Sequence, residues 1–203
     1  IALKKGKIVA VKGVGGYLLL CDAANTETIE LLRKRKHRPA KPFALLYKDI
    51  DMALQDVILS AEEQNALEEN SAPIVLCKVD RNINGLSLHE IAPGLSRIGI
   101  MLPYSGLLLL ITERFGKPLI ATSGNISGSP IIFRDAEALK WLCGVADMIL
   151  TFDREIVTPQ DDSVIQYTES GKKIILRRSR GLAPSYFPDP FKEKDECILA
   201  MGG

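Results

Sequence analysis

Long apolar runs and clustered metal-binding residues are both missing from this 203-residue sequence. No apolar stretch approaches the roughly 20 residues of a membrane-spanning helix, so we expect no membrane segment. The scattered cysteines form no C-x-x-C pair, and the first three lie in apolar surroundings typical of small buried thiols: Cys21, Cys77, Cys143 and Cys197. With His37 and His89 as the only histidines, neither a protein metal site nor a Ser-His-Asp triad is indicated. This cysteine usage favours a reducing, cytoplasmic compartment.

Two common phosphate-binding motifs are also absent. The chain has no Gly-x-x-x-x-Gly-Lys-Ser stretch, and "GVGGY" at residues 13–17 lacks the spacing of the dinucleotide fingerprint. A nucleotide site in this protein therefore has to be built in another way.

Positive charge is concentrated in two short segments, although the net charge is only +1. Residues 33–41, "RKRKHRPAK", hold six Lys or Arg, residues 172–180, "KKIILRRSR", hold five, and neither segment contains an acid. The rest of the chain carries fifteen Lys or Arg against all 25 Asp and Glu residues. If the two segments meet in space they form an anion site; otherwise they are two solvated basic faces.

Short β-type runs alternate with helical segments along the chain. The expected strands are residues 7–12, 17–21, 43–47, 74–77, 97–101, 118–122 and 147–151, followed by a hairpin of 163–167 with 172–177. Helices interspersed with strands, together with an antiparallel hairpin, predict a single α/β domain with a mixed, twisted sheet.

Helix signals lie between these runs. The expected helices are residues 26–38, 60–70, 106–116 and 135–144. Ser60 and Glu63 form a capping box for the second helix. The third, "GLLLLITERFG", has the composition of a buried helix, and Trp141 is expected to be a core residue of the fourth.

Small polar groups follow a buried strand in "ATSGNISGSPI" at residues 121–131. They lie where the strand ends, and α/β folds bind ligands at the carboxyl ends of their strands. Glycines let the backbone approach an anion closely, and successive N–H groups with Ser hydroxyls cradle a phosphate. A tight turn with Asx and Ser caps explains the same stretch equally well.

Two motifs that occur in order resemble the YrdC/TsaC family: "KHRPAKPFALL" at residues 36–46 and "PLIATSGNISGSP" at residues 118–130. The resemblance spans most of residues 5–187. The tRNA-modifying members carry a Pro-Thr-Asp/Glu-Thr-x-Tyr-Gly-Leu opening, where this chain has "VKGVGGYLLLCDAAN". That stretch, with "RIGIMLPYSGLLLLI", "DREIVTPQDDSVI" and "LRRSRGLAPSYFP", is similar instead to the YrdC-like domain of the HypF carbamoyltransferases.

The resemblance implies an open, twisted, mixed sheet flanked by helices. Residues 1–187 would form this YrdC-like domain, and residues 188–203 a linker and the start of a truncated C-terminal domain. The stretch "CILAMGG" resembles the start of the next HypF domain. Because the sequence starts without Met, we expect it to be a piece of a longer protein.

The resemblance also implies an activity: ATP-dependent adenylation of carbamate derived from carbamoyl phosphate, giving carbamoyl-adenylate and pyrophosphate. A C-terminal transferase domain of the same chain would pass the carbamoyl group to a cysteine of a partner in hydrogenase maturation. ATP is the expected nucleotide, and Mg²⁺ would arrive with it.

Both reactants are anions, so the site has to screen their repulsion and hold the carbamate oxygen in line with the α-phosphate, without a protein nucleophile. The residues expected to bind phosphates and carboxylate are Lys36, Arg38 and Lys41. The resemblance adds a cradle of Ser123, Asn125 and Ser127, a nucleotide contact at Asp162 and Ser163, Arg180 closing over the phosphates, and Tyr17 lining the carbamate pocket.

Several of these assignments have simpler alternatives. A half-buried strand tyrosine explains Tyr17 equally well, and each cation has the alternative of being solvated. Relatives often carry a basic residue just before "DDSV", where this chain reads "TPQ" at residues 158–160, which puts one nucleotide contact in doubt.

Two other functions stay open. The first is a tRNA threonylcarbamoyladenylate synthase, whose signature opening this chain lacks. The second is a noncatalytic module that binds double-stranded RNA through its basic segments, with a steep salt dependence and no need for ATP. A pI near 7.8 and the acidic remainder of the chain argue against a large RNA footprint.

Overall fold

The computed structural model describes residues 2–79, 85–126 and 128–184. Its strands are β1 (Val9–Lys12), β2 (Tyr17–Asp22), β3 (Ala44–Leu46), β4 (Val57–Ile58), β5 (Ile74–Val79), β6 (Arg97–Met101), β7 (Leu119–Ser123), β8 (Met148–Leu150), β9 (Val164–Tyr167) and β10 (Lys173–Arg177). Its helices are the 3-10 turn η1 (Leu3–Lys5) and α1 (Thr26–Arg35), α2 (Ile50–Ala53), α3 (Ala61–Glu68), α4 (Leu88–Ile91), α5 (Gly106–Phe115) and α6 (Asp135–Trp141).

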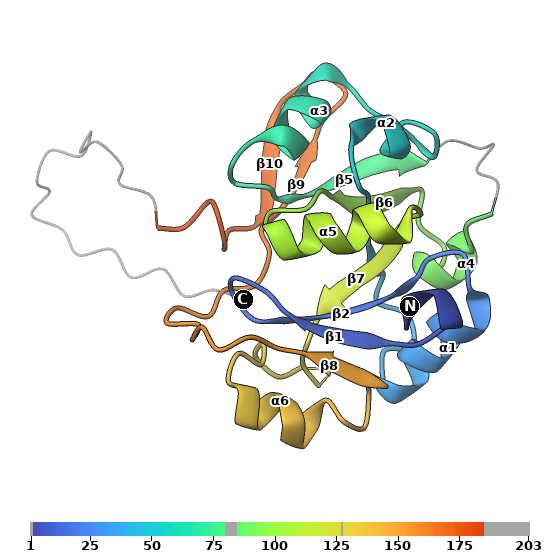
Figure 1. Cartoon of the computed structure of the whole chain (residues 1–203). Helices are drawn as coiled ribbons and strands as arrows, with labels where there is room; N and C mark the ends of the chain where they lie inside the picture. Colours follow the sequence, from blue (N-terminus) through green and yellow to red (C-terminus); the bar gives the residue numbers. More distant parts are fainter. Residues whose placement is uncertain (1, 80–84, 127, 185–203) are drawn as a thin grey trace, which may run out of the picture.

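The strands form a single mixed sheet in the order β10-β9-β5-β6-β3-β7-β2-β1-β8, with β4 paired to β5 (Figure 1). The pairs β3 with β6, β5 with β9 and β1 with β8 are parallel, and the other pairs are antiparallel. The predicted open mixed sheet is confirmed, and so is the predicted hairpin, which is β9 and β10. The predicted linker and domain start at residues 188–203 lie outside the described residues.

Each face of the sheet carries its own hydrophobic core, because successive strand residues point to opposite faces. In β2, Leu18 and Leu20 pack with Leu108 and Phe115 of α5. The intervening residues of β2 pack on the opposite face with residues of α1, α3, α4 and α6. Helices therefore cover both faces, and α5 lies on the same face as Leu3 of η1 (Figure 1).

Local capping signals place two helices where the sequence predicts them. The side chain of Asn25 accepts from the backbone N–H of Thr28 and begins α1. The predicted capping box of α3 is present, with Ser60 and Glu63 each accepting from the other's backbone N–H.

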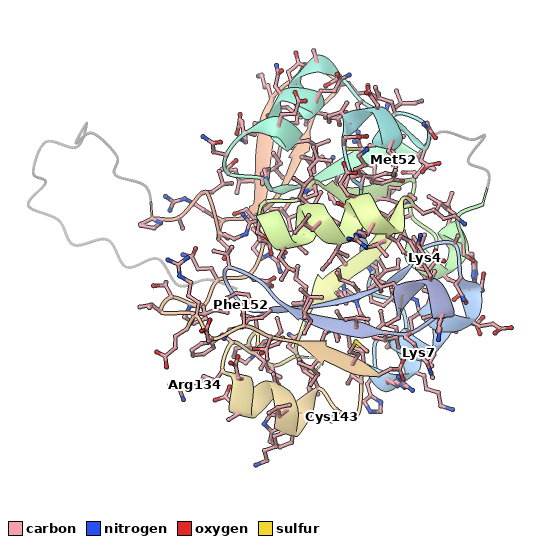
Figure 2. The ribbon with its side chains drawn as sticks, in the orientation of Figure 1. Lys4, Lys7, Met52, Arg134, Cys143 and Phe152 are labelled. Atoms are coloured by element: carbon pink, nitrogen blue, oxygen red, sulfur yellow. The ribbon has the colours of Figure 1, made fainter. Side chains whose placement is uncertain are left out.

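Three burial predictions are wrong. Helix α5 buries one side only, since Leu109 and Leu110 are exposed. Trp141 is 47% exposed, because α6 buries Ala138 and the chain then buries Leu142, which leaves the indole on the outer side. Cys143, beyond the end of α6, is exposed (Figure 2). Cys21 and Cys77 are buried as predicted.

The short elements α2, α4 and β4 were not predicted, because runs of two to four residues carry no readable periodicity. Within the described ranges, no helix is long and apolar enough to cross a membrane.

Candidate functional site

A cavity of about 520 Å³ opens on the sheet face that carries α5, a volume within the range of small-molecule sites. Its floor is a row of small residues on neighbouring strands. Ala44 of β3 lies opposite Ala121 of β7 on one side and opposite Gly99 of β6 on the other. Leu76 of β5 lies opposite Gly99 and bounds the row with a larger side chain. Small side chains on three adjacent strands leave the space that larger ones would fill.

The first basic segment forms one wall of this cavity. After α1 the chain turns sharply at His37, whose φ of 51° lies in the left-handed region. Buried Arg33 then fixes the turn, because its Nη1 donates to the carbonyl oxygens of Arg38 and Lys41 at 2.9 and 3.1 Å. The guanidinium of Arg33 also stacks on the ring of Phe43, 4.5 Å from its centroid. The segment is therefore held rigidly at the cavity wall.

Lys36 joins this segment to the polar turn after β7. Its side chain is only 2% exposed. Nζ donates to the carbonyl oxygens of Ser123 and Asn125 at 2.6 and 2.7 Å, and to Oδ1 of Asn125 at 2.6 Å. Oγ of Ser123 donates to the same Oδ1 at 2.9 Å. These contacts bring together three of the residues that the sequence assigned to one site.

Arg38 and Lys41 also line the cavity. Nε of Arg38 donates to the carbonyl oxygen of Lys41 at 3.1 Å, Nη1 reaches Oγ1 of Thr122 at 3.3 Å, and Nη2 donates to the carbonyl oxygen of Pro42. The side chain of Lys41 is exposed and has no hydrogen-bond or ion-pair partner within the described part of the chain.

The second basic segment reaches the opposite wall through Arg177, at the end of β10. Its Nη1 donates to Oδ2 of Asp161 at 2.6 Å, and its Nε to the carbonyl oxygen of Asp162 at 2.7 Å. The two Lys/Arg-rich segments therefore meet around one cavity that includes the Ser123–Asn125 turn. Of the two alternatives that the sequence left open, the structure therefore supports convergence, through Arg177 of the second segment.

Close backbone packing holds the turn in place. A Cβ on Gly124 would lie 2.7 Å from Cβ of Tyr17, so only glycine fits there. Gly15 in the β1–β2 turn packs equally closely against Gln160, whose N–H donates to the carbonyl oxygen of Gly15 at 2.9 Å. The "GVGGY" stretch therefore serves as a support beneath the site.

Three of the assigned residues lie outside the cavity lining. Tyr17 is fully buried in the core of the other sheet face, where its hydroxyl donates to Oδ1 of Asp135 at 2.7 Å. Ser163 is buried, and its Oγ donates to the carbonyl oxygen of Arg180 at 2.9 Å. The guanidinium of Arg180 pairs with Asp162 at 2.9 Å. None of the three is in a position to touch a ligand in the cavity as described.

Asp162, Ser127 and the stretch at residues 158–160 each have a different outcome. Asp162 lines the cavity, but its carboxylate already forms an ion pair with the guanidinium of Arg180. Ser127 lies outside the described residues. Gln160, in the stretch where relatives carry a basic residue, donates from Nε2 to the carbonyl oxygen of Ala183 at 3.4 Å and supports the backbone.

Crowded positive charge and burial set the proton affinities of the wall. Burial, followed by the charge of Arg38, lowers the pKa of Lys36 to about 7, with Asp161 opposing and Lys41 adding to the change. Burial and the charge of Arg33 lower the pKa of Arg38 to about 10. Positive groups held this close to one another favour an anion between them.

Sequence reasoning missed Arg33, Arg177 and Asp161 as parts of the site. Arg33 and Arg177 lie within the two basic segments, but neither carried a motif that separated it from its neighbours. The pairing of β9 with β10 shows why Arg177 belongs to the site: it lies opposite Val164 of β9, which also lines the cavity.

Similarity to known proteins identifies the family of this chain. The family model Sua5/YciO/YrdC, described as "Telomere recombination", matches residues 1–179. The chain belongs to the Sua5/YciO/YrdC family. Within this family the likeness to HypF proteins is much stronger than that to threonylcarbamoyl-AMP synthases.

A protein named carbamoyltransferase HypF from Synechocystis sp. is 42% identical over 203 residues, covering 99% of this chain and 26% of the relative. A solved structure of full-length HypF in a phosphate- and nucleotide-bound form superposes with a TM-score of 0.86 at 41% identity, covering 90% of this chain and 28% of that one. A threonylcarbamoyl-AMP synthase from Photobacterium profundum is 25% identical over 135 residues, 64% of this chain and 71% of the relative. The chain spans about a quarter of the length of the HypF relatives.

Proposed function

We propose that this chain joins carbamate to ATP, forming carbamoyl-adenylate and pyrophosphate, as the adenylate-forming domain of a carbamoyltransferase. The observation that carries the proposal is the convergence of Arg38, Lys41 and Arg177 around a cavity of ligand size beside the Ser123–Asn125 turn. The similarity to a HypF solved with phosphate and nucleotide supports a nucleotide in this cavity.

Joining carbamate to ATP requires a site that stabilises negative charge and aligns the two reactants. A carbamate oxygen attacks the α-phosphorus of ATP, the bond from that phosphorus to the bridging oxygen breaks, and pyrophosphate leaves. The cationic walls reduce repulsion between the two anions and stabilise the leaving pyrophosphate, while the small-residue floor lets both lie close to the sheet. No protein nucleophile takes part.

Mg²⁺ fits this site only as part of the nucleotide complex. Among the described residues there is no group of three or more His, Cys, Asp or Glu side chains that would hold a metal ion. Asp161 and Asp162 face the cavity but are paired with Arg177 and Arg180. The metal would neutralise phosphate charge, and the protein residues would position the complex.

The wider assignment follows from the same resemblance. We propose that the domain acts in the cytoplasm and that a C-terminal transferase domain of the same polypeptide passes the carbamoyl group to a cysteine of a hydrogenase maturation partner. Carbamoyl phosphate would be the source of the carbamate.

Exchange of labelled pyrophosphate into ATP tests the reaction directly. Three arms contain carbamoyl phosphate, ammonium bicarbonate as a chemical source of carbamate, or threonine with bicarbonate. We expect exchange with ammonium bicarbonate, and with carbamoyl phosphate where its hydrolysis is also supplied. Exchange that requires threonine would instead identify a threonylcarbamoyladenylate synthase. Salt-sensitive binding of double-stranded RNA without any exchange would identify the noncatalytic module.

A matched pair of lysine variants tests the cavity. Lys41→Ala removes an exposed charge at the cavity wall, and Lys172→Ala removes an exposed charge outside the lining. We expect the first to weaken ATP binding about tenfold, as for a charged hydrogen bond, with little change in the melting temperature. The second should change neither. Unfolding of Lys41→Ala, or equal ATP affinities, would contradict the role given to Lys41.

A further inference from the structure

The three wall cations that the sequence grouped together differ in how many of their N–H groups are already used. A lysine ammonium has three donors and a guanidinium has five. Lys36 spends three donors on three oxygens of the Ser123–Asn125 turn, all within 2.7 Å. Arg38 donates to three protein oxygens, which leaves two N–H groups.

Burial reinforces this difference. Lys36 belongs to the cavity lining but is only 2% exposed, and its ammonium group already donates to three oxygens of the turn. Exposed Lys41 keeps all three donors for a ligand. An anion that took one donor of Lys36 would leave a turn oxygen buried without its partner, at a cost comparable to the bond gained.

We propose that Lys36 is a positioning residue: its ammonium group fixes the Ser123–Asn125 turn in the shape that binds the ligand, and it makes no direct bond to the ligand. The free donors of Lys41 and Arg38 are left to meet the anion. The inference rests on the proposed function only for the identity of that ligand, since the three bonds are present in the free protein.

The arrangement explains why a charged side chain is needed at this point. Three oxygens converge within 2.7 Å of one atom, and their partial negative charges repel one another unless a donor to each is present. A neutral side chain of the same length supplies at most some of these bonds. The turn would then open, carrying the Asn125 amide, which donates to the carbonyl oxygen of Ser129 at 2.5 Å.

Amide hydrogen exchange in the ligand-free protein provides the test. Exchange of a peptide covering residues 120–126 is compared at pH 6, below the pKa of about 7 of Lys36, so that its ammonium group carries all three donors; the proteins are the wild type, Lys36→Met and the matched variant Lys41→Met. We expect Lys36→Met to accelerate exchange at least about tenfold in this peptide, as for loss of charged hydrogen bonds, and Lys41→Met to leave it unchanged. Because no ligand is present, the result is independent of whether the cavity binds ATP.

Rescue separates loss of the ammonium group from general damage to the fold. In Lys36→Ala, added n-propylammonium can occupy the vacated space and supply three donors, whereas 1-propanol of similar shape supplies one. We expect propylammonium, and not propanol, to restore slow exchange and part of the ATP affinity. Wild-type exchange in Lys36→Met, or equal effects of Lys36→Met and Lys41→Met, would overturn the proposal. Rescue by propanol would also overturn it, because filling space would then be enough.

Discussion

Arg177 donates from Nη1 to Oδ2 of Asp161 at 2.6 Å, and this pair forms the wall that faces the first basic segment. The two residues come from different parts of the chain, one from the end of β10 and the other from the segment before β9. Asp161 also faces Lys36 and Arg38 closely enough to oppose the lowering of their pKa values. The carboxylate of Asp161 is thus paired with Arg177 and also attracts the positive charges of Lys36 and Arg38.

Replacing Arg177 should weaken ligand binding. The Arg177→Met variant removes a cavity cation and frees Asp161, which adds negative charge where the triphosphate is expected. We expect the dissociation constant for ATP to rise roughly tenfold to a hundredfold, as for a charged hydrogen bond. Titration calorimetry measures this, with Lys172→Met on the same hairpin as the control. An unchanged affinity would remove Arg177 from the site.

Replacing Arg180 should instead destabilise the fold. Its guanidinium pairs with buried Asp162, donates to the carbonyl oxygen of Ala72 at 2.8 Å and stacks on Tyr104 at 3.6 Å. Arg180→Met leaves the Asp162 charge buried without a partner, so we expect a loss of about 3–5 kcal/mol in the free energy of unfolding.

Denaturant unfolding checks this value, and adding Asp162→Asn to Arg180→Met should recover part of it. A stable Arg180→Met protein that no longer binds ATP would show that Arg180 contacts the nucleotide, as the resemblance implied.

Filling the floor of the cavity should block binding without removing any charge. Ala44→Leu places a larger side chain in the row between Ala121 and Gly99. We expect ATP affinity to fall at least about tenfold, because the ligand loses the space it occupies, while circular dichroism keeps the native pattern. Ala61→Leu, at an exposed position on α3, is the control for the change in side chain. Normal ATP binding by Ala44→Leu would place the ligand elsewhere.

ATP binding should take up a proton above pH 7. The pKa of Lys36 lies near 7 in the free protein, lowered by burial and Arg38 together with Lys41, and opposed by Asp161. A bound triphosphate favours the charged ammonium and raises this pKa, so at pH 8 the complex holds more protons than the free protein.

Binding heats in two buffers of different ionisation enthalpy measure the uptake, which should approach one proton at pH 8 and fall toward zero at pH 6. Lys36→Met should abolish it. Identical heats in the two buffers at pH 8 would show that Lys36 stays charged in the free protein.

Strands and longer helices were predictable because their signals are local. The capping box of Ser60 and Glu63 and the continuous apolar run of β2 depend on neighbours within a few residues. Trp141 was misplaced because amphipathic spacing does not tell how much of a seven-residue helix the sheet covers.

The site was predictable in part for the same reason. The motif residues Lys36, Arg38, Lys41, Ser123 and Asn125 do meet at one cavity, whereas Tyr17, Ser163 and Arg180 face elsewhere. A motif records that a residue type is present at a position, and side-chain direction depends on register and burial. Arg180 and Arg177 lie three residues apart, yet one pairs with buried Asp162 and the other lines the cavity.

The sequence by itself determined the composition of the site: two cation-rich segments and a small polar turn after a buried strand, enough to indicate an anionic ligand. Only the tertiary structure decided which donors remain free for that ligand. Long-range contacts bring Lys36 to oxygens nearly ninety positions away in the sequence, and the N–H donors of its ammonium group are used in hydrogen bonds to them. A hydrogen bond used within the protein cannot also be offered to a ligand, and no local pattern records which bonds are used.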